Sequence, residues 1–256
     1  MKERPILFSG PMVRAILDGR KTQTRRVAIP SRSCVDFIGG GPKHGPDWND
    51  PTCWGFEDLN TGFWWALRGN EDCHQLACPH GMVGDRLWVR ETHAEVFEVD
   101  IPAGRPRGPI GTAGSPARPD WKSRYVYLAD GPMPNVQWHH VGDSQPVRWT
   151  PSIHMRRWAS RITLEITGLR VERLQDICEI DAEAEGIDFL RRGPDADETL
   201  DARGLFRCLW DRLNAPRDQR WDATPWVWVV EFRRLESAES KACAERRALR
   251  SKIRQG

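Results

Sequence analysis

Tyrosine is scarce in this chain, and several longer patterns are missing. Only two of the 256 residues are Tyr, against 13 Trp, so the large aromatic side chains are mostly indoles. No window approaches the roughly eighteen apolar residues that a membrane-spanning helix needs. No apolar run follows the opening MKERP, so a signal peptide is not expected. These absences predict a cytoplasmic protein without a membrane partner.

Charge and cysteine usage narrow the class further. The formal net charge is only +2, so any attraction to nucleic acid must come from local basic patches. Apolar residues make up 39% of the chain, which is enough for a hydrophobic core. Seven Cys is an odd number in a chain too long to need disulfides, which favours reduced thiols in a cytoplasm.

The periodicity of apolar residues predicts an α+β protein. Regular βαβ alternation is missing, so a small mixed β-barrel flanked by helices fits better than a doubly wound sheet. We expect helices at 9–20, 174–186 and 198–214, a hairpin within 54–67 that turns near 60–62, and strands at 21–29, 84–99, 124–130, 160–173 and 225–235.

The chain is expected to form one domain, residues 1–235, with two long insertions. Residues 31–83 and 102–147 are rich in Pro and Gly and are predicted to be mostly loop. Residues 236–256 form an Ala-rich tail with six basic and three acidic residues, a charge run that is usually solvated.

A basic cluster surrounds two threonines near the N-terminus, in the stretch "ILDGRKTQTRR" at residues 16–26. Charged residues often protect an edge strand, so this stretch is either a solvated strand or part of a binding site. The choice depends on the other motifs of the chain.

Four segments, in order, resemble the ASCH domain of the PUA-like superfamily: "ILDGRKTQTRR", "GDRLWVRE", "LQDICEIDAEAEGI" and "WVWVVEFRRL". Together with "PSIHMRRWASRITLEI", the set looks like the long ASCH-like proteins of phages and prophages. The resemblance covers most of residues 4–235. It implies a PUA-like barrel with a cleft between the barrel and its helices.

The resemblance also implies a function. Small bacterial ASCH proteins include amidohydrolases that remove the acyl group of N4-acetylcytidine with a Lys, a Thr and a Glu. By motif, these correspond to Lys21, Thr24 and Glu185, with Glu183 as the alternative carboxylate. We therefore expect a protein that handles a nucleobase or nucleoside without a cofactor. The alternatives are a non-catalytic module that binds RNA or modified DNA, and a metal-stimulated ribonuclease; no protein partner is inferred.

The proposed chemistry places two demands on Lys21. To act as a base near pH 7, its pKa must fall by about three units from about 10.4, which burial and the charges of Arg20, Arg25 and Arg26 would favour. In a regular strand, residues 21 and 24 would point to opposite faces. Lys21 must therefore precede the strand, at a turn that Gly19 permits.

Further polar residues are candidates for holding the substrate, and each has a structural alternative. They are Arg20, Arg26, Arg90, Glu91, His154 and Arg156. Arg90 and Glu91 are equally well explained as an ion pair on a half-buried strand. Ser152 and His154 do not suggest a hydrolase triad, because no G-x-S-x-G motif surrounds the serine. The loop of His154, Arg156 and Trp158 is instead suited to holding a phosphate and stacking on a base.

Cysteine and histidine are densest in the first predicted insertion, at Cys53, Cys73, His74, Cys78 and His80. Their spacing lacks the short C-x₂-C pairs that zinc sites favour. Whether Cys53, Cys73, Cys78 and His80 bind a structural zinc is left open, and no catalytic metal is predicted.

Overall fold

The computed structural model describes residues 1–29, 35–36, 57–58, 63–68, 73–97, 122–132, 148–191 and 200–235. Three α-helices are joined by strands and short 3₁₀ turns within these ranges, so the α+β class is confirmed. The helices are α1 (Gly10–Leu17), α2 (Glu179–Ala184) and α3 (Ala202–Asn214). The strands are β1 (Glu3–Leu7), β2 (Gln23–Val27), β3 (Val35–Asp36), β4 (Glu57–Asp58), β5 (Phe63–Arg68), β6 (Cys73–Leu76), β7 (Arg86–Arg90), β8 (His93–Phe97), β9 (Ser123–Tyr127), β10 (Thr163–Arg173) and β11 (Trp226–Arg234).

The main sheet has the strand order β1-β7-β10-β11-β2. Strand β11 pairs antiparallel with both β10 and β2, in registers that place Val229 opposite Arg170 and Arg25, and Val230 opposite Leu169 and Thr24. As described, this sheet has two edge strands, β1 and β2, so it is not a closed barrel. No helix in the described ranges is long and apolar enough to cross a membrane.

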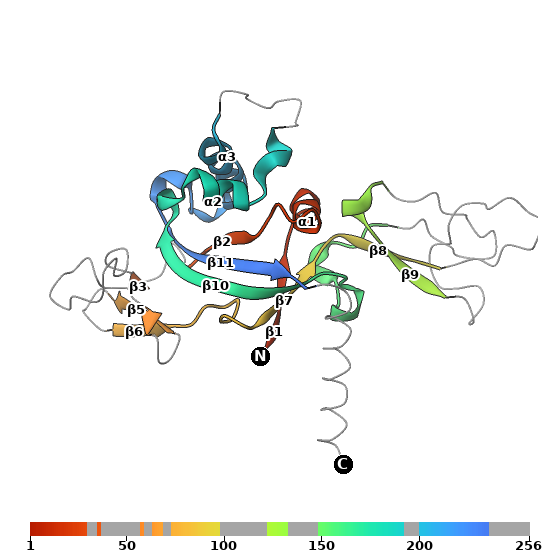
Figure 1. Ribbon diagram of the computed structural model, residues 1–256, viewed down its shortest axis with the longest axis horizontal. Helices are drawn as coiled ribbons and strands as arrows, with labels where there is room; N and C mark the ends of the chain where they lie inside the picture. Colours follow the sequence, from red (N-terminus) through yellow and green to blue (C-terminus); the bar gives the residue numbers. More distant parts are fainter. Residues whose placement is uncertain are drawn as a thin grey trace, which may run out of the picture. The chain divides into compact units, whose positions relative to one another are not determined.

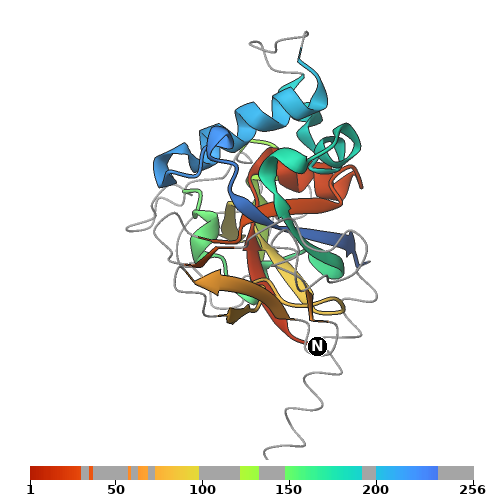
Figure 2. The ribbon, with the colours of Figure 1, turned by 90° about the vertical axis from the view of Figure 1, so that its left-hand side faces the viewer.

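Two compact units make up the chain. The first contains residues 1–4, 15–87 and 163–256, and the second contains residues 5–14 and 88–162. In the first unit, α2 and α3 lie on the same side of β10 and β11, as both ribbon views show (Figures 1 and 2). Residues 226–230 of β11 are all buried, which explains the nearly continuous apolar run in that strand.

The second unit contains the two-stranded sheet β8-β9, in which His93 pairs with Tyr127. Its described core is formed by Trp88, Met155 and Ala159, against which two tyrosines pack. The tyrosine-poor sequence therefore uses both of its tyrosines, Tyr125 and Tyr127, in this unit.

Several elements appear where the sequence predicts them. Helix α1, strand β2, strand β10, helix α3 and strand β11 all fall within their predicted ranges, apart from the boundaries. The predicted hairpin is confirmed by the pairing of Asp58 with Phe63. However, the region expected to be mostly loop also contains β3 and β6, both of which pair with β5.

Three predicted elements are wrong in extent. The strand expected over 124–130 ends at Tyr127, because Leu128–Asp130 forms a 3₁₀ turn. The strand expected over 84–99 divides after Arg90, because β8 leaves the main sheet to pair with β9. The helix expected over 174–186 is only the six residues of α2, since Leu174–Asp176 forms a 3₁₀ turn and Cys178 caps the helix by accepting a hydrogen bond from Asp181 N. Leu174 and Ile177 are buried, but Ile180 is 81% exposed, so their spacing does not mark one helical face.

Candidate active site

Lys21 is positioned by the turn that follows α1. Gly19 has φ +75°, a left-handed conformation that glycine adopts without steric cost. The backbone N–H groups of Arg20 and Lys21 both donate to Ala15 O, at 2.8 and 3.0 Å. Strand β2 begins only at Gln23, so Lys21 precedes the strand, as the chemistry of the predicted site requires.

The amine of Lys21 forms a buried ion pair with Glu185. Lys21 Nζ donates to Glu185 Oε2 at 2.7 Å, to Glu185 O at 2.8 Å and to Gln23 O at 2.8 Å. The two residues are only 2% and 3% exposed. An ammonium group has three protons to donate, and these three hydrogen bonds use all of them. Three acceptors around one nitrogen suit an ammonium group that faces the carboxylate of Glu185.

Burial lowers the pKa of Lys21 below its ordinary value. Glu185 opposes this shift through its charge and its hydrogen bond, whereas the charges of Arg26 and Arg25 reinforce it. Arg20 is instead neutralised by Asp18 at 2.7 Å and Asp188 at 3.0 Å, which raise its pKa. The direction is the one that a catalytic lysine needs, and burial is its main cause.

Arg25 links Glu185 to a group of acidic residues on the first unit. Its guanidinium contacts Glu172, Asp181 and Glu185, the last at 3.4 Å. Burial alone would raise the pKa of Asp181, but Arg25, Gln23 and Arg170 hold it below its ordinary value. In the sequence alone, Arg25 is distinguished only as a positive charge near Lys21. The only sequence signal for its position is the alternation of a strand, which places Arg25 and Gln23 on the same face.

Thr24 lies next to this group but faces away from Arg25. Alternation along β2 places Thr24 and Arg26 on one face of the sheet, and Gln23 and Arg25 on the other. Lys21 Nζ bonds the carbonyl of the peptide that joins Gln23 to Thr24, which brings the amine beside this residue. Thr24 is 2% exposed, and the three hydrogen bonds described for the Lys21 amine go to Gln23 and Glu185.

The structure distinguishes between the two candidate carboxylates. Glu183 is directed away from Lys21 and pairs with Arg191 at 2.6 Å, with 42% of its side chain exposed. Glu185 is the residue that contacts Lys21. The C-terminal end of α2 thus supplies the carboxylate of the group that we call the Lys21 site: Lys21, Thr24, Arg25 and Glu185.

The remaining candidates belong to the second unit. There, Glu91 is 1% exposed and binds Arg161 through two hydrogen bonds of 2.9 and 3.0 Å. Arg161 also binds Asp130 at 2.7 Å and lies over the Tyr127 ring, 4.0 Å from its centroid. The alternative that paired Glu91 with Arg90 is wrong. Arg90 donates to Ile153 O at 3.2 Å and lies over the Trp88 ring at 4.7 Å.

His154 and Arg156, two further substrate-binding candidates, are exposed on the segment Pro151–Ser160 of the second unit. The partner of Glu91, Arg161, was missed because nothing in its local sequence marks it as paired with a buried carboxylate. The described structure therefore divides the predicted site residues into two groups. Lys21, Thr24, Glu185, Arg20 and Arg26 lie in the first unit.

The possible metal ligands show no cluster where the structure describes them. No group of three or more His, Cys, Asp or Glu side chains suited to a metal is found in the described ranges. Burial raises the pKa of Cys78 to about 11 and lowers that of His80 to about 4. Cys53 and the side chains of Cys73 and His74 lie outside the described part.

Gly186 provides a test of how tightly the Lys21 site is packed. A Cβ at this position would lie 2.7 Å from Lys21 Cβ and 2.9 Å from Ala15 Cβ, and its φ is +74°. Gly19 has the same backbone conformation, with φ +75°, but nothing within 4 Å of the added Cβ. We expect Gly186→Ala to destabilise by about 2–3 kcal/mol and Gly19→Ala by about 1 kcal/mol, measured by urea unfolding. Equal losses would show that crowding at Gly186 is absent.

The chain matches no family model, and it has no significant match among curated proteins or solved structures. The function proposed below therefore depends on the motif resemblance and on the geometry of the site.

Proposed function

We propose that the protein is an ASCH-like, cytoplasmic nucleoside-handling enzyme with a PUA-like arrangement. It hydrolyses the N-acyl amide of a modified cytidine such as N4-acetylcytidine. The observation that carries the proposal is the buried pair of Lys21 and Glu185 beside Thr24, with Nζ and Oε2 2.7 Å apart. The resemblance assigns catalysis to these three residue types, and the fold brings Lys21 and Glu185 into contact.

Thr24 is the nucleophile in this proposal. Its hydroxyl oxygen attacks the acyl carbon, and the proton passes to the neutral amine of Lys21. The C–N bond then breaks, the exocyclic amine of the base leaves with a proton from Lys21, and water hydrolyses the acyl ester of Thr24. Because a base must come within about 3.2 Å of the proton it takes, Lys21 must exchange its bond to Gln23 O for one to Thr24 when substrate binds.

A second candidate is binding of the same ligand without catalysis. It is favoured by the three hydrogen bonds that hold Lys21 as an ammonium, because an ammonium cannot accept a proton. In this case, Lys21 and Arg25 contribute only to the architecture of the site and to its positive charge.

Turnover of N4-acetylcytidine distinguishes the two. Purified protein is incubated with the nucleoside, and cytidine is followed by chromatography. We expect Lys21→Ala and Thr24→Ala each to lower the rate at least about a hundredfold, because they remove the base and the nucleophile. Glu183→Gln, which alters only the exposed neighbour on α2, should retain wild-type turnover.

The outcome of that assay is decisive in either direction when folding is checked by circular dichroism. No turnover by the wild-type protein, or turnover at the wild-type rate in both alanine variants, would contradict the catalytic proposal. Retained binding of the nucleoside without product would instead support the second candidate.

A further inference from the structure

The segment Pro151–Ser160 of the second unit is held firmly but exposes unusual side chains. It contains two 3₁₀ turns, Ser152–His154 and Arg157–Ala159. Met155 and Ala159, only 1% and 2% exposed, anchor it in the core beside Trp88. At its end, Ser160 Oγ donates to Val89 O at 2.7 Å, and Ala159 O accepts a hydrogen bond of 2.8 Å from Tyr127 OH. The exposed residues are thus presented on a fixed backbone.

Trp158 is the most conspicuous of these residues. It is 66% exposed, and its indole Nε1 donates to Tyr125 OH at 3.1 Å. The Arg156 guanidinium carbon lies 5.0 Å from the centroid of its ring. One hydrogen bond and one cation–π contact therefore orient the indole while much of its surface stays open. Ile153, 59% exposed, adds a second apolar side chain.

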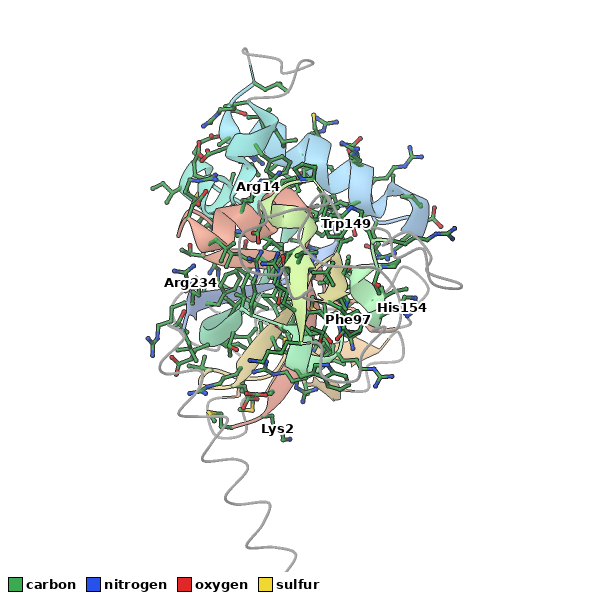
Figure 3. The ribbon with its side chains drawn as sticks, turned by 90° about the vertical axis from the view of Figure 1, so that its right-hand side faces the viewer. Lys2, Arg14, Phe97, Trp149, His154 and Arg234 are labelled. Atoms are coloured by element: carbon green, nitrogen blue, oxygen red, sulfur yellow. The ribbon has the colours of Figure 1, made fainter. Side chains whose placement is uncertain are left out.

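Positive charge dominates this unit. Its described residues include eight basic and three acidic side chains, namely Arg14, Arg90, Lys122, Arg124, Arg148, Arg156, Arg157 and Arg161 against Glu91, Glu95 and Asp130. Both Glu91 and Asp130 are already bound by Arg161. His154 and Arg156 are exposed beside Trp158 in the sequence, and Figure 3 labels His154 on this unit. Arg156 lies over the exposed indole, so the immediate surroundings of the ring carry a positive charge that attracts anions.

We propose that the surface formed by Ile153, His154, Arg156 and Trp158, the Trp158 surface, binds single-stranded nucleic acid. An unpaired base stacks on the open part of the indole, and Arg156 and His154 contact the adjoining phosphates. Aromatic stacking combined with basic side chains is the general means of holding single strands, because every base offers a flat face and every nucleotide a charge. A duplex keeps its bases stacked inside and cannot use the indole in this way.

This inference goes beyond the proposed activity and does not depend on it, because the Trp158 surface and the Lys21 site belong to different units. A protein partner fits the surface less well. Protein interfaces favour a larger apolar centre, whereas here two exposed apolar side chains stand among several cations.

Fluorescence anisotropy with labelled 12-nucleotide oligo(U) and oligo(dT) tests the proposal on the full chain. We expect Trp158→Ala to weaken binding about five- to hundredfold, and Trp158→Phe to weaken it less, because phenylalanine keeps part of the stacking. Arg156→Ala should lower the slope of log affinity against log salt by about 0.7, the value for one lost phosphate contact on a single strand. Oligo(dU), which differs from oligo(U) only by lacking the 2′-hydroxyl, tests whether the sugar is recognised.

Two control variants separate this surface from the rest of the chain. Ile180→Ala removes an apolar side chain that is 81% exposed on the first unit, and it should leave binding unchanged. Glu183→Gln, at an exposed position of the first unit, should also retain binding. Because the Trp158 surface contains no residue of the Lys21 site, failure of the amidohydrolase proposal leaves this one intact. A matched 12-base-pair duplex that binds as tightly as the single strands would overturn the proposal. Wild-type affinity in Trp158→Ala would do the same, because it would show attraction by charge alone.

Discussion

Glu185→Ala is expected to lower the free energy of unfolding by about 3–5 kcal/mol, the usual cost of removing one partner of a buried ion pair. The substitution leaves Lys21, which is 2% exposed, without the carboxylate that accepts its shortest hydrogen bond. It also removes one of the acids that contact the buried Arg25. Urea unfolding followed by circular dichroism measures the change, with the midpoint and the slope reported separately.

Glu183→Ala is the matched control for that experiment. Both glutamates belong to the same turn of the chain, but Glu183 is 42% exposed and pairs with an arginine that is 47% exposed. Exposed pairs of this kind contribute about 0–1 kcal/mol. A similar loss in the two variants would show that the contact with Lys21 does not stabilise the fold.

A double substitution tests whether the penalty comes from the charge left behind. Lys21→Met with Glu185→Leu replaces both ions by apolar side chains of similar size. We expect this variant to be more stable than Glu185→Ala alone, because no unpaired ammonium remains. A double variant as unstable as the sum of its single substitutions would contradict this account and would assign the loss to packing.

Arg161→Met is expected to have a comparable effect on the second unit, about 3–5 kcal/mol. The substitution removes both hydrogen bonds to Glu91, a carboxylate that is 1% exposed, and the contact with the Tyr127 ring. Arg156→Met alters an exposed arginine of the same unit that also lies over an aromatic ring, and it should cost less than about 1 kcal/mol.

The stability of the Arg161→Met variant is expected to depend on pH in a direction that the pKa of Glu91 determines. Burial raises the pKa of Glu91, and the charge and hydrogen bonds of Arg161 oppose the shift. A folded-state pKa above the unfolded value of about 4.3 means that the folded protein binds the proton more tightly, so stability falls as pH rises through the interval between the two values. Without Arg161, the folded-state pKa of Glu91 rises further, so the pH interval over which stability falls extends to higher pH.

Thermal unfolding between pH 4 and pH 8 therefore measures the prediction directly. Arg161→Met should lose more stability than the wild-type protein as pH increases, and adding Glu91→Gln should remove that difference. An Arg161→Met variant whose loss of stability is the same at every pH would show that Glu91 is not the titrating group.

Elements that depend on neighbouring residues could be predicted from local patterns in the sequence. Pro11 and Gly19 bracket an apolar face that became α1, and the long apolar run at 225–235 became β11. The placement of Lys21 ahead of its strand followed from the period of two in β-structure together with the turn at Gly19. Each of these inferences needed only neighbouring residues.

Contacts between residues far apart in the sequence could not be predicted from local patterns. The stretch 84–99 reads as one strand because alternation continues across Glu91, but β8 pairs with a strand some thirty residues further on, as in the register of His93 with Tyr127. Likewise, Arg161 is separated from Glu91 by 70 residues, and no spacing rule connects them. The motif resemblance singles out Lys21 and Glu185, which are 164 residues apart and in contact. It gave no indication of the network around Arg25.

The position of Lys21 has a consequence for assembly. Phe232 N donates to Thr22 O and Ala28 N to Trp226 O, so the even-numbered residues of β2 bond to β11 and Gln23 turns its carbonyl outward. Exposed backbone groups of this kind can template the addition of a strand from another molecule. Here the amine of Lys21 donates a hydrogen bond to the outward carbonyl of Gln23. Glu185, at the C-terminal end of α2, supplies the negative charge that pairs with this amine. The ion pair of Lys21 and Glu185, which we propose to be catalytic, thus also protects the start of the edge strand β2 against pairing with a strand of another molecule.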